Sequence, residues 1–371
     1  MTPWFIGLMS GTSLDGVDAV LARFPANAPM QVRAHAHRPM PDALRAELLA
    51  LNRRGDDEVH RAALAANAVA ELYAAAVHML LAEAGAATAD IRALGAHGQT
   101  VRHRPAEFDG TGYTVQLLNG ALLAERCGID VVCDFRSRDV AAGGQGAPLV
   151  PAFHAARFGR PGEALAVLNI GGIANLSLLH ADGSVGGFDT GPGNTLMDHW
   201  CERHHGAAFD DDGRWAASGA VREALLAQWL AEPFFQRAPP KSTGRDLFDP
   251  AWLAAGLAAQ PGLQAADVQA TLAELTARSA AQALQRHAPS TSRLLVCGGG
   301  ALNGHLMRRL TALLPGIVVG STAEAGLPPL QVEAAAFAWL AQAFVERRPG
   351  NRPEVTGARG PRVLGVLHPA C

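Results

Sequence analysis

The stretch that decides the fold opens the sequence and reads Trp4-Phe5-Ile6-Gly7-Leu8-Met9-Ser10-Gly11-Thr12-Ser13-Leu14-Asp15-Gly16-Val17-Asp18-Ala19-Val20-Leu21. Two apolar runs flank a turn of small, hydroxylated and acidic residues, which predicts a β-hairpin. Glycine in such a turn lets the backbone approach another group closely. The N–H groups of the turn and the hydroxyls of Thr12 and Ser13 could then hold an anion such as phosphate. A nucleotide is therefore the first ligand that this stretch suggests.

Length and composition indicate a globular protein that handles small molecules. The chain has 371 residues and a mass of 38.7 kDa, which favours two domains. Hydrophobic residues make up 49% and charged residues 18%, which leaves little room for long disorder. The net charge of −3 gives no basic surface of the kind that binds nucleic acid, so no nucleic-acid partner is expected.

The features that target proteins to membranes or for export are not expected here. The first positive charge is Arg23, so the N-terminal region lacks the basic start of a signal peptide. The longest apolar tract, 62–87, contains charged residues such as Glu71 and Glu83 and predicts an amphipathic helix rather than a membrane span. The 5 cysteines are odd in number and scattered, which argues against a disulfide framework. We expect a cytoplasmic protein.

Strands alternate with helices along the chain, which predicts an α/β fold. The expected helices are 41–51, 60–87 and 119–126, and the expected strands after the first hairpin include 91–95, 113–117 and 129–133. Polar segments that begin at His97 and Asp134 directly follow two of these strands. In α/β folds such positions, just past the strand ends, are where sites are built.

The opening pattern returns in the middle of the chain. An apolar strand, 165–170, precedes Gly171-Gly172, and a second apolar strand, 173–179, follows. The repetition indicates an internal duplication of architecture rather than of sequence. Because glycine turns are common, two unrelated hairpins are the alternative interpretation.

A third glycine element favours the duplication. A strand at 293–297 runs into Gly298-Gly299-Gly300, and a helix is expected from His305 to Leu314. Three glycines let a flat ring lie against the backbone, and the helix N-terminus offers the positive end of a dipole. The two hairpins and the triple glycine together resemble the actin, sugar-kinase and heat-shock ATPase superfold. That resemblance implies a two-lobed, ribonuclease H-like α/β fold with ATP in the cleft between the lobes.

Three other nucleotide or hydrolase motifs are incomplete. Lys241-Ser242-Thr243 ends like a P-loop, but prolines stand where its glycines should be. Asn303 occupies the third glycine position of a dinucleotide fingerprint that would start at Gly298. Asp15 replaces the last glycine of a nucleophile elbow, which argues against a serine hydrolase.

The segment Gly186-Gly187-Phe188-Asp189-Thr190-Gly191-Pro192-Gly193-Asn194 places one acidic residue in what we expect to be a loop of glycines and a proline. With this segment the chain resembles the anhydro-N-acetylmuramic acid kinase family, sugar kinases of peptidoglycan recycling. The motifs that carry the resemblance run in order from end to end: 10–18, 97–100, 134–136, 143–148, 169–175, 189–194, 240–245, 298–303 and 333–340.

The resemblance implies roles for individual residues. The ATP phosphates would be bound by Gly11, Thr12, Ser13, Leu14, Asp15, Gly16, Val17 and Asp18, with Gly171 and Gly172 as the second phosphate hairpin. Gly298, Gly299 and Gly300 would lie on the adenosine side. Asp189 would be the catalytic base, and Glu333 part of the sugar site. The family pattern often has an acidic residue shortly before that glutamate, whereas this chain reads Pro329-Leu330-Gln331-Val332.

The implied reaction differs from that of an ordinary sugar kinase. In a 1,6-anhydro sugar the O6 atom is tied to C1, so there is no hydroxyl for a base to deprotonate. Asp189 would instead take a proton from a water that attacks C1, while O6 accepts the γ-phosphoryl of ATP. The products would be N-acetylmuramate 6-phosphate and ADP, with Mg²⁺ neutralising phosphate charge. Asp15 and Asp189 are candidates for direct or water-mediated contact with that ion.

The resemblance also bears on organisation. We expect a first lobe over 1–131, to which 357–371 could return, and a second lobe over 132–356. A homodimer is implied, with a small sugar as the ligand.

Several residues keep a second interpretation. Asp15 could be a turn-former that bonds its own backbone, and Asp18 could simply end a strand. Arg136 and Arg245 could pair with the lactyl carboxylate of a muramic acid or form surface ion pairs.

Two other functions stay open at this point. One is a kinase for a different anhydrosugar, and the other is an actin-like ATPase that acts through assembly or partner binding.

Overall fold

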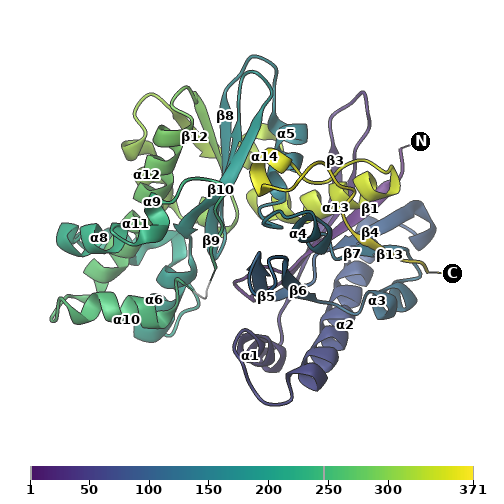
Figure 1. The fold of residues 1–371 in the computed structure, drawn as a ribbon, viewed down its shortest axis with the longest axis horizontal. Helices are drawn as coiled ribbons and strands as arrows, with labels where there is room; N and C mark the ends of the chain where they lie inside the picture. Colours follow the sequence, from purple (N-terminus) through teal and green to yellow (C-terminus); the bar gives the residue numbers. More distant parts are fainter. Residues whose placement is uncertain (1, 245–246, 371) are drawn as a thin grey trace. The chain divides into compact units, whose positions relative to one another are not determined.

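The computed structural model describes residues 2–244 and 247–370. The chain divides into two compact units, one formed by Met1–Arg157 with Gln331–Cys371 and the other by Phe158–Leu330. Each unit is built on a mixed β-sheet against which helices of the same unit pack (Figure 1). The α/β class expected from the sequence is confirmed.

The sheet of the first unit begins with the predicted hairpin. The strands β1 (Trp4–Met9), β2 (Gly16–Arg23) and β3 (Gln31–Pro39) pair antiparallel in succession. On the other side of β1, β4 (Ile91–Ala96) and β7 (Val131–Cys133) add parallel strands. The C-terminal β13 (Val366–His368) then pairs antiparallel with β7, giving the order β13-β7-β4-β1-β2-β3. Because β1 and β4 are parallel, the turn that follows β1 and the loop that follows β4 lie at the same end of the sheet.

Two long helices cover this sheet. The helix α2 (Glu58–Ala84) contributes Val69, Tyr73 and Leu80 to a core with the first hairpin, and α13 (Val332–Val345) packs on the other face. Gly7 of β1 and Gly95 of β4 allow α13 to lie close, because a Cβ at either position would strike its backbone. The remaining elements of the unit are α1 (Asp42–Leu51), β5 (Gln99–Pro105), β6 (Gly112–Leu117), α3 (Gly120–Cys127), α4 (Ser137–Ala141), α5 (Val150–Phe158) and α14 (Pro353–Thr356).

The helix α2 is, by length and composition, a candidate for crossing a membrane. Of its most apolar window, 56% is buried inside the structure. A core helix of a globular unit passes the same test of length and apolarity, and the contacts of α2 with β2 and β3 are those of a core helix.

The sheet of the second unit repeats the order of the first. Its strands β8 (Leu165–Ile170), β9 (Ile173–Leu179) and β10 (Val185–Pro192) pair antiparallel in succession. The strand β11 (Arg293–Cys297) pairs parallel with β8, and β12 (Val318–Ser321) pairs parallel with β11. The order β10-β9-β8-β11-β12 thus matches β3-β2-β1-β4-β7 strand for strand. The predicted duplication of architecture is confirmed.

The buried helix α11 (Ala265–His287) forms the centre of the second core, together with α12 (Gly304–Leu313). Figure 1 shows both helices beside the second sheet. The smaller helices of the unit are α6 (Thr195–His205), α7 (Arg214–Ser218), α8 (Glu223–Leu230), α9 (Pro233–Gln236) and α10 (Pro250–Ala258).

The unit boundaries differ from those expected. The first boundary lies after Arg157 rather than after 131, and the C-terminal return begins at Gln331 rather than at 357. The physical reason is tertiary pairing, because β7 extends the first sheet and α13 covers it.

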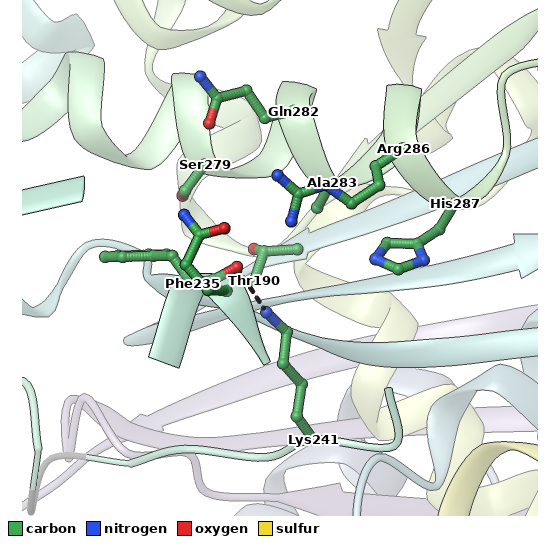
Figure 2. A pocket seen from close by; sticks show the side chains of 9 residues that line it. Thr190, Phe235, Lys241, Ser279, Gln282, Ala283, Arg286 and His287 are labelled. Atoms are coloured by element: carbon green, nitrogen blue, oxygen red, sulfur yellow. Dashed lines mark hydrogen bonds between the residues drawn. The ribbon is translucent and has the colours of Figure 1, made fainter. Parts of the chain in front are cut away.

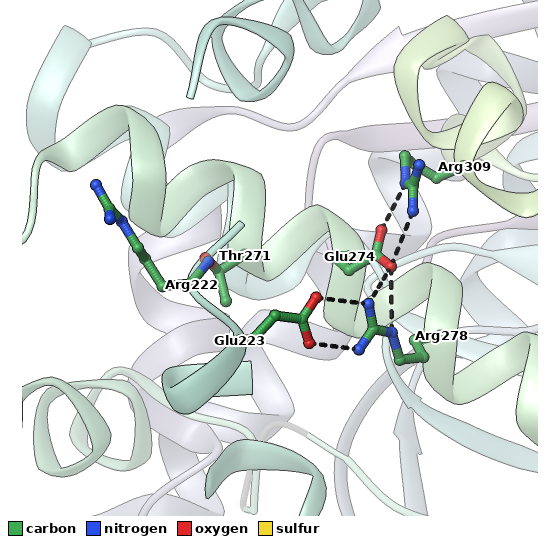
Figure 3. A network of polar contacts seen from close by, with 6 residues as sticks. All are labelled: Arg222, Glu223, Thr271, Glu274, Arg278 and Arg309. Carbon is green, nitrogen blue, oxygen red and sulfur yellow. Dashed lines mark hydrogen bonds and ion pairs between the residues drawn. The ribbon is translucent and has the colours of Figure 1, made fainter. Parts of the chain in front are cut away.

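A buried carboxylate ties α11 to its neighbours in the second unit (Figure 3). Glu274 of α11 is 1% exposed and accepts hydrogen bonds from Arg309 of α12 and from Arg278 one turn further along α11, at 2.7 and 2.9 Å. Arg278 also donates to the exposed Glu223 of α8, at 2.8 and 3.0 Å. This network fixes α12, which follows the triple glycine, against α11.

We expect Glu274→Gln to lower the free energy of unfolding by about 2–3 kcal/mol, because two arginines would lose their shared buried carboxylate. Glu223→Gln serves as the matched control, since that carboxylate is solvated and its loss should change stability far less. Urea titration of both variants measures the difference. Equal stabilities would show that the network does not hold the helices.

Candidate functional site

The first hairpin turn, residues 10–15, is anchored at its base by buried groups of its own unit. The Ser10 hydroxyl hydrogen-bonds with the Tyr73 hydroxyl at 2.8 Å, and both lie 3.2 Å from the carbonyl oxygen of Gly98. The Gly11 carbonyl accepts the Leu14 N–H at 3.3 Å and the Gln99 amide at 3.1 Å. Leu14 has a φ of 55°, an uncommon value that its buried side chain helps to impose. The turn is therefore held in one conformation.

The predicted phosphate-binding residues differ in what they can offer a ligand. Gly11, Thr12 and Ser13 are partly accessible, and Asp15 is exposed. Leu14 and Val17 instead point into the hydrophobic core, so they shape the turn. Within the described ranges the Asp15 carboxylate forms no hydrogen bond or ion pair, so it does not cap its own turn.

Asp18 lies within β2, and its carboxylate is engaged by two histidines of β3. His35 Nε2 and His37 Nδ1 lie 3.0 and 3.1 Å from the same carboxylate oxygen. Burial alone would raise the pKa of Asp18, but the hydrogen bonds to His35 and His37 outweigh it and lower that pKa. The hydrogen bond to Asp18 raises the pKa of His37. Asp18 thus links β2 to β3, and its contact with a nucleotide stays a prediction.

The segments that follow β4 and β7 meet at the first hairpin. His97 Nδ1 donates to the Ser10 carbonyl oxygen at 3.2 Å, and its Nε2 accepts from the Arg136 guanidinium at 2.9 Å. Burial, with the charge of Arg136, lowers the pKa of His97 to about 3, so the ring is neutral. Arg136 also donates to the carbonyl oxygen of Gly146 at 2.9 Å. Arg136 is thus part of a structural network that braces the turn, whereas Arg245 lies outside the described residues.

Glu333, the predicted sugar ligand, belongs to the first unit. It lies in the first turn of α13, next to Ala334, the residue that packs against Gly7 of β1. The fold therefore brings Glu333 to the sheet that contains the first hairpin, although the two are far apart in the sequence.

In the second unit, the end of β10 folds back onto the second glycine turn. The N–H groups of Gly193 and Asn194 donate to the carbonyl oxygens of Gly172 and Gly171, at 2.9 and 2.8 Å. The Asn194 side chain donates to the Ile170 carbonyl oxygen at 3.1 Å. Gly193 is required because a Cβ there would strike the Gly171 carbonyl oxygen. The turn and the segment that carries Asp189 thus form one connected structure.

The triple glycine lies against the same turn. Because β11 is parallel to β8, Gly298 follows the strand end beside Asn169 and Ile170. Gly298 has a φ of 77°, and a Cβ at Gly300 would strike the Ile170 side chain, whereas at Gly299 the nearest atom lies 3.5 Å away. The structure therefore brings Gly171, Gly172 and the triple glycine together, as the sequence patterns implied.

Asp189 lies in the edge strand β10, which corrects the expectation of a loop. Gly186, Gly187 and Gly191 pair antiparallel with β9, and the register shifts between Asp189 and Gly191. Such a bulge redirects a side chain and is frequent beside active sites. The side of β10 away from β9 is covered by the segment 241–243, whose Lys241 carbonyl accepts the Asp189 N–H at 3.1 Å. The Thr243 N–H donates to Asp189 Oδ2 at 2.9 Å, so this segment fixes the carboxylate.

The side chain of Lys241 anchors that segment from a small pocket (Figure 2). Its ammonium donates to the Phe234 carbonyl oxygen at 3.1 Å and lies 4.6 Å from the centre of the Phe234 ring. Burial, followed by the charge of Arg286, lowers the pKa of Lys241 to about 8. In the sequence Lys241 was noted as a false P-loop lysine and as part of the motif 240–245, and its structural role was missed.

The structure distributes the predicted residues between the two units. The first unit holds residues 11–18 and Glu333, and the second holds Gly171, Gly172, Asp189 and the triple glycine. Across residues 2–244 and 247–370, no group of three or more histidine, cysteine or acidic side chains could hold a metal ion.

Comparison with known proteins shows the family of this chain. The model of the family described as anhydro-N-acetylmuramic acid kinase matches residues 3–370. A protein of Variovorax paradoxus (strain S110) that bears this name is 62% identical over 371 residues, which cover 99% of this chain and 99% of that protein. The protein of the same name from Cupriavidus pinatubonensis (strain JMP 134 / LMG 1197) is 60% identical and covers 98% of both chains.

Similarity to solved structures is distant. The activator of the 2-hydroxyisocaproyl-CoA dehydratase from Clostridium difficile, with bound ADPNP, has a TM-score of 0.47 and 12% sequence identity. The match covers 93% of this chain and 96% of that one. Because this match is so distant, it supports no conclusion about this chain, and the fold rests on the strand order of the two sheets.

Gly299 and Gly300, two adjacent residues of the triple glycine, should respond differently to an added methyl group. We expect Gly300→Ala to lower the free energy of unfolding by about 1–3 kcal/mol, because the methyl overpacks the contact with Ile170. Gly299→Ala is the matched control and should leave the stability of the ligand-free protein nearly unchanged. Denaturant unfolding measures both, and a Gly300→Ala variant as stable as the control would contradict the close contact.

Proposed function

The chain belongs to the anhydro-N-acetylmuramic acid kinase family, and we propose on this premise how its residues divide the work of the reaction. The enzyme is an ATP-dependent sugar kinase of peptidoglycan recycling. It opens the 1,6-anhydro ring of 1,6-anhydro-N-acetylmuramic acid with water and phosphorylates O6. The observation that carries this function is the family match over residues 3–370.

The chemistry requires two linked displacements. Water forms a bond to C1 as the C1–O6 bond breaks, and O6 forms a bond to the γ-phosphorus as the bond to the ADP oxygen breaks. The proton lost by water must be accepted by the protein. Such a reaction depends mainly on positioning and on charge stabilisation.

Asp189 is the residue we assign as the base. Its main-chain N–H donates to the Lys241 carbonyl oxygen, and its Oδ2 atom accepts the Thr243 N–H, so both the backbone and the carboxylate are bonded to the segment 241–243. Only 7% of the residue is exposed. A base placed in this way contributes roughly 10²- to 10⁴-fold to the rate.

The glycine turns are the groups we assign to ATP. Gly11, Thr12 and Ser13, together with Gly171 and Gly172, would bind phosphates, and Gly298 to Gly300 would lie against adenosine. Leu14, Gly16 and Val17 would act through the shape of the turn, because all three are buried. Asp18 would contribute only by fixing β2 to β3.

Mg²⁺ is the ion we propose for this ATP. When bound it would neutralise charge on the phosphates, and it commonly takes one or two carboxylates and keeps several waters. The exposed Asp15 carboxylate is the donor in the phosphate turn that fits such an ion.

Glu333 is assigned to the sugar, from its place in the first turn of α13. The finer features implied by the family resemblance are a cytoplasmic location and a homodimer, which we retain as part of the proposal.

The source of the new C1 oxygen tests the proposed reaction. We expect incubation with ATP, Mg²⁺, the anhydro sugar and ¹⁸O-labelled water to give N-acetylmuramate 6-phosphate with ¹⁸O at C1 and none in the new phosphate ester. Mass spectrometry with fragmentation locates the label. A phosphorylated product that keeps the anhydro bridge would refute the coupled reaction.

Replacement of Asp189, the proposed base, should lower turnover strongly without weakening the binding of ATP. We expect Asp189→Asn to lower kcat by roughly 10²-fold or more, since the amide cannot accept the proton, while ATP affinity changes little. Asp182→Asn, in the exposed turn between β9 and β10, is the matched control. Steady-state kinetics and calorimetric ATP titration give both quantities, and near wild-type turnover by Asp189→Asn would rule out this base.

A further inference from the structure

Four side chains form a row across the sheet of the second unit, at the ends of its strands. Cys297 of β11 is the register partner of Asn169 of β8, Asn169 is the partner of Asn175 of β9, and Asn175 is the partner of Asp189 of β10. Directly opposite residues on paired strands place their side chains on the same face. The row therefore leads from the strand before the triple glycine to the proposed base.

The row lies on the face of the sheet away from the α11 core. The neighbouring residues Ala174, Leu176 and Phe188 belong to the hydrophobic core cluster, and side chains alternate along a strand. Asn175 and Asp189 consequently point away from that core and toward the same side.

The amide oxygen of Asn175 is buried and has no hydrogen-bond partner among the residues that the structure describes. Its neighbour Asn169 differs, because the Asn169 amide oxygen lies 3.6 Å from the Cys297 thiol. An unpaired buried polar group costs roughly 1–3 kcal/mol and calls for an explanation such as a water or a catalytic role. Asparagine is also unfavourable in a strand, so the fold gains little from this residue. The structure thus presents an acceptor without a partner on the residue that pairs with the proposed base.

We propose that Asn175 is a further catalytic residue, whose amide oxygen binds the water that attacks C1. This inference rests on the proposed function of the site. Water has two O–H bonds, and a base accepts the proton of only one. The second O–H is donated to Asn175 Oδ1, which orients a lone pair of the water oxygen toward C1.

The balance of the step is unchanged by Asn175. The water oxygen bonds to C1, the C1–O6 bond breaks, and O6 takes the phosphoryl group from ATP. One water proton goes to the Asp189 carboxylate, and the other stays in the new C1 hydroxyl. Asn175 holds that second O–H throughout and is not itself protonated.

This role predicts how the enzyme selects its nucleophile. Methanol has one O–H, so when it donates to Asp189 it places a methyl group against the Asn175 amide oxygen. The wild-type enzyme should therefore disfavour methanol. An apolar side chain at position 175 should accept the methyl group and lose the preference for water.

The test measures products in water containing a fixed proportion of methanol, with ATP, Mg²⁺ and the anhydro sugar. For Asn175→Leu we expect kcat to fall about 10- to 100-fold, by the loss of one positioned hydrogen bond. The KM for ATP should stay within about threefold, because the amide does not touch the nucleotide. The ratio of methyl glycoside 6-phosphate to N-acetylmuramate 6-phosphate should rise about fivefold or more over wild type, on the same differential-binding argument.

Controls keep the outcome decisive. Asn175→Ala is the second variant if leucine impairs folding, and because alanine is also apolar it should raise the methanol ratio too. Ser177→Ala, on the same face of β9 but further from the strand end, should leave the ratio unchanged. An unaltered ratio in folded Asn175 variants would overturn this inference. A wild-type enzyme that forms no ring-opened phosphate would instead overturn the proposed function.

Discussion

The parallel pairing of the first and fourth strands of each sheet is the constraint on which the rest of the structure depends. Parallel strands end at the same edge, so the segments that follow them must meet. In the first unit this pairing joins β1 to β4 and brings Ser10 against His97. In the second it joins β8 to β11 and brings the turn at Gly171 beside Gly298. Residues 87 positions apart in the first unit and 298 − 171 = 127 positions apart in the second are thereby placed together by the same rule.

The second requirement is that other parts of the chain pack closely against certain backbone positions, and glycine allows this because it has no Cβ atom. Gly7 and Gly95 let α13 lie against the first sheet, which carries Glu333 to that sheet. Gly300 makes room for the Ile170 side chain, and Gly193 for the carbonyl of Gly171. Gly300, predicted from the sequence to bind a ligand, is therefore also a packing residue, and both uses limit what can replace it.

The proposed base illustrates how an edge strand can carry a fixed side chain. On one side β10 pairs with β9, whose Asn175 faces Asp189, and on the other it pairs with the segment that contains Lys241 and Thr243. A strand whose backbone is paired on both sides gives its side chain a fixed starting point, which is what catalysis by positioning demands. The Lys241 side chain anchors the segment that holds Asp189, and burial of its ammonium lowers the pKa of Lys241.

The sequence by itself determined the local elements and the chemistry they carry. Two apolar runs on either side of a glycine turn predicted each hairpin, and the order of motifs along the chain identified the family. Both signals can be seen in the sequence because each motif lies within a short stretch of chain. Only the tertiary structure decided that 185–192 forms a strand, that the Asp18 carboxylate contacts His35 and His37, and that the C-terminal α13 returns to the first sheet. It alone placed Asn175 opposite Asp189. Such facts depend on strand register and long-range packing, and no local pattern of residues encodes which distant strand will be the neighbour.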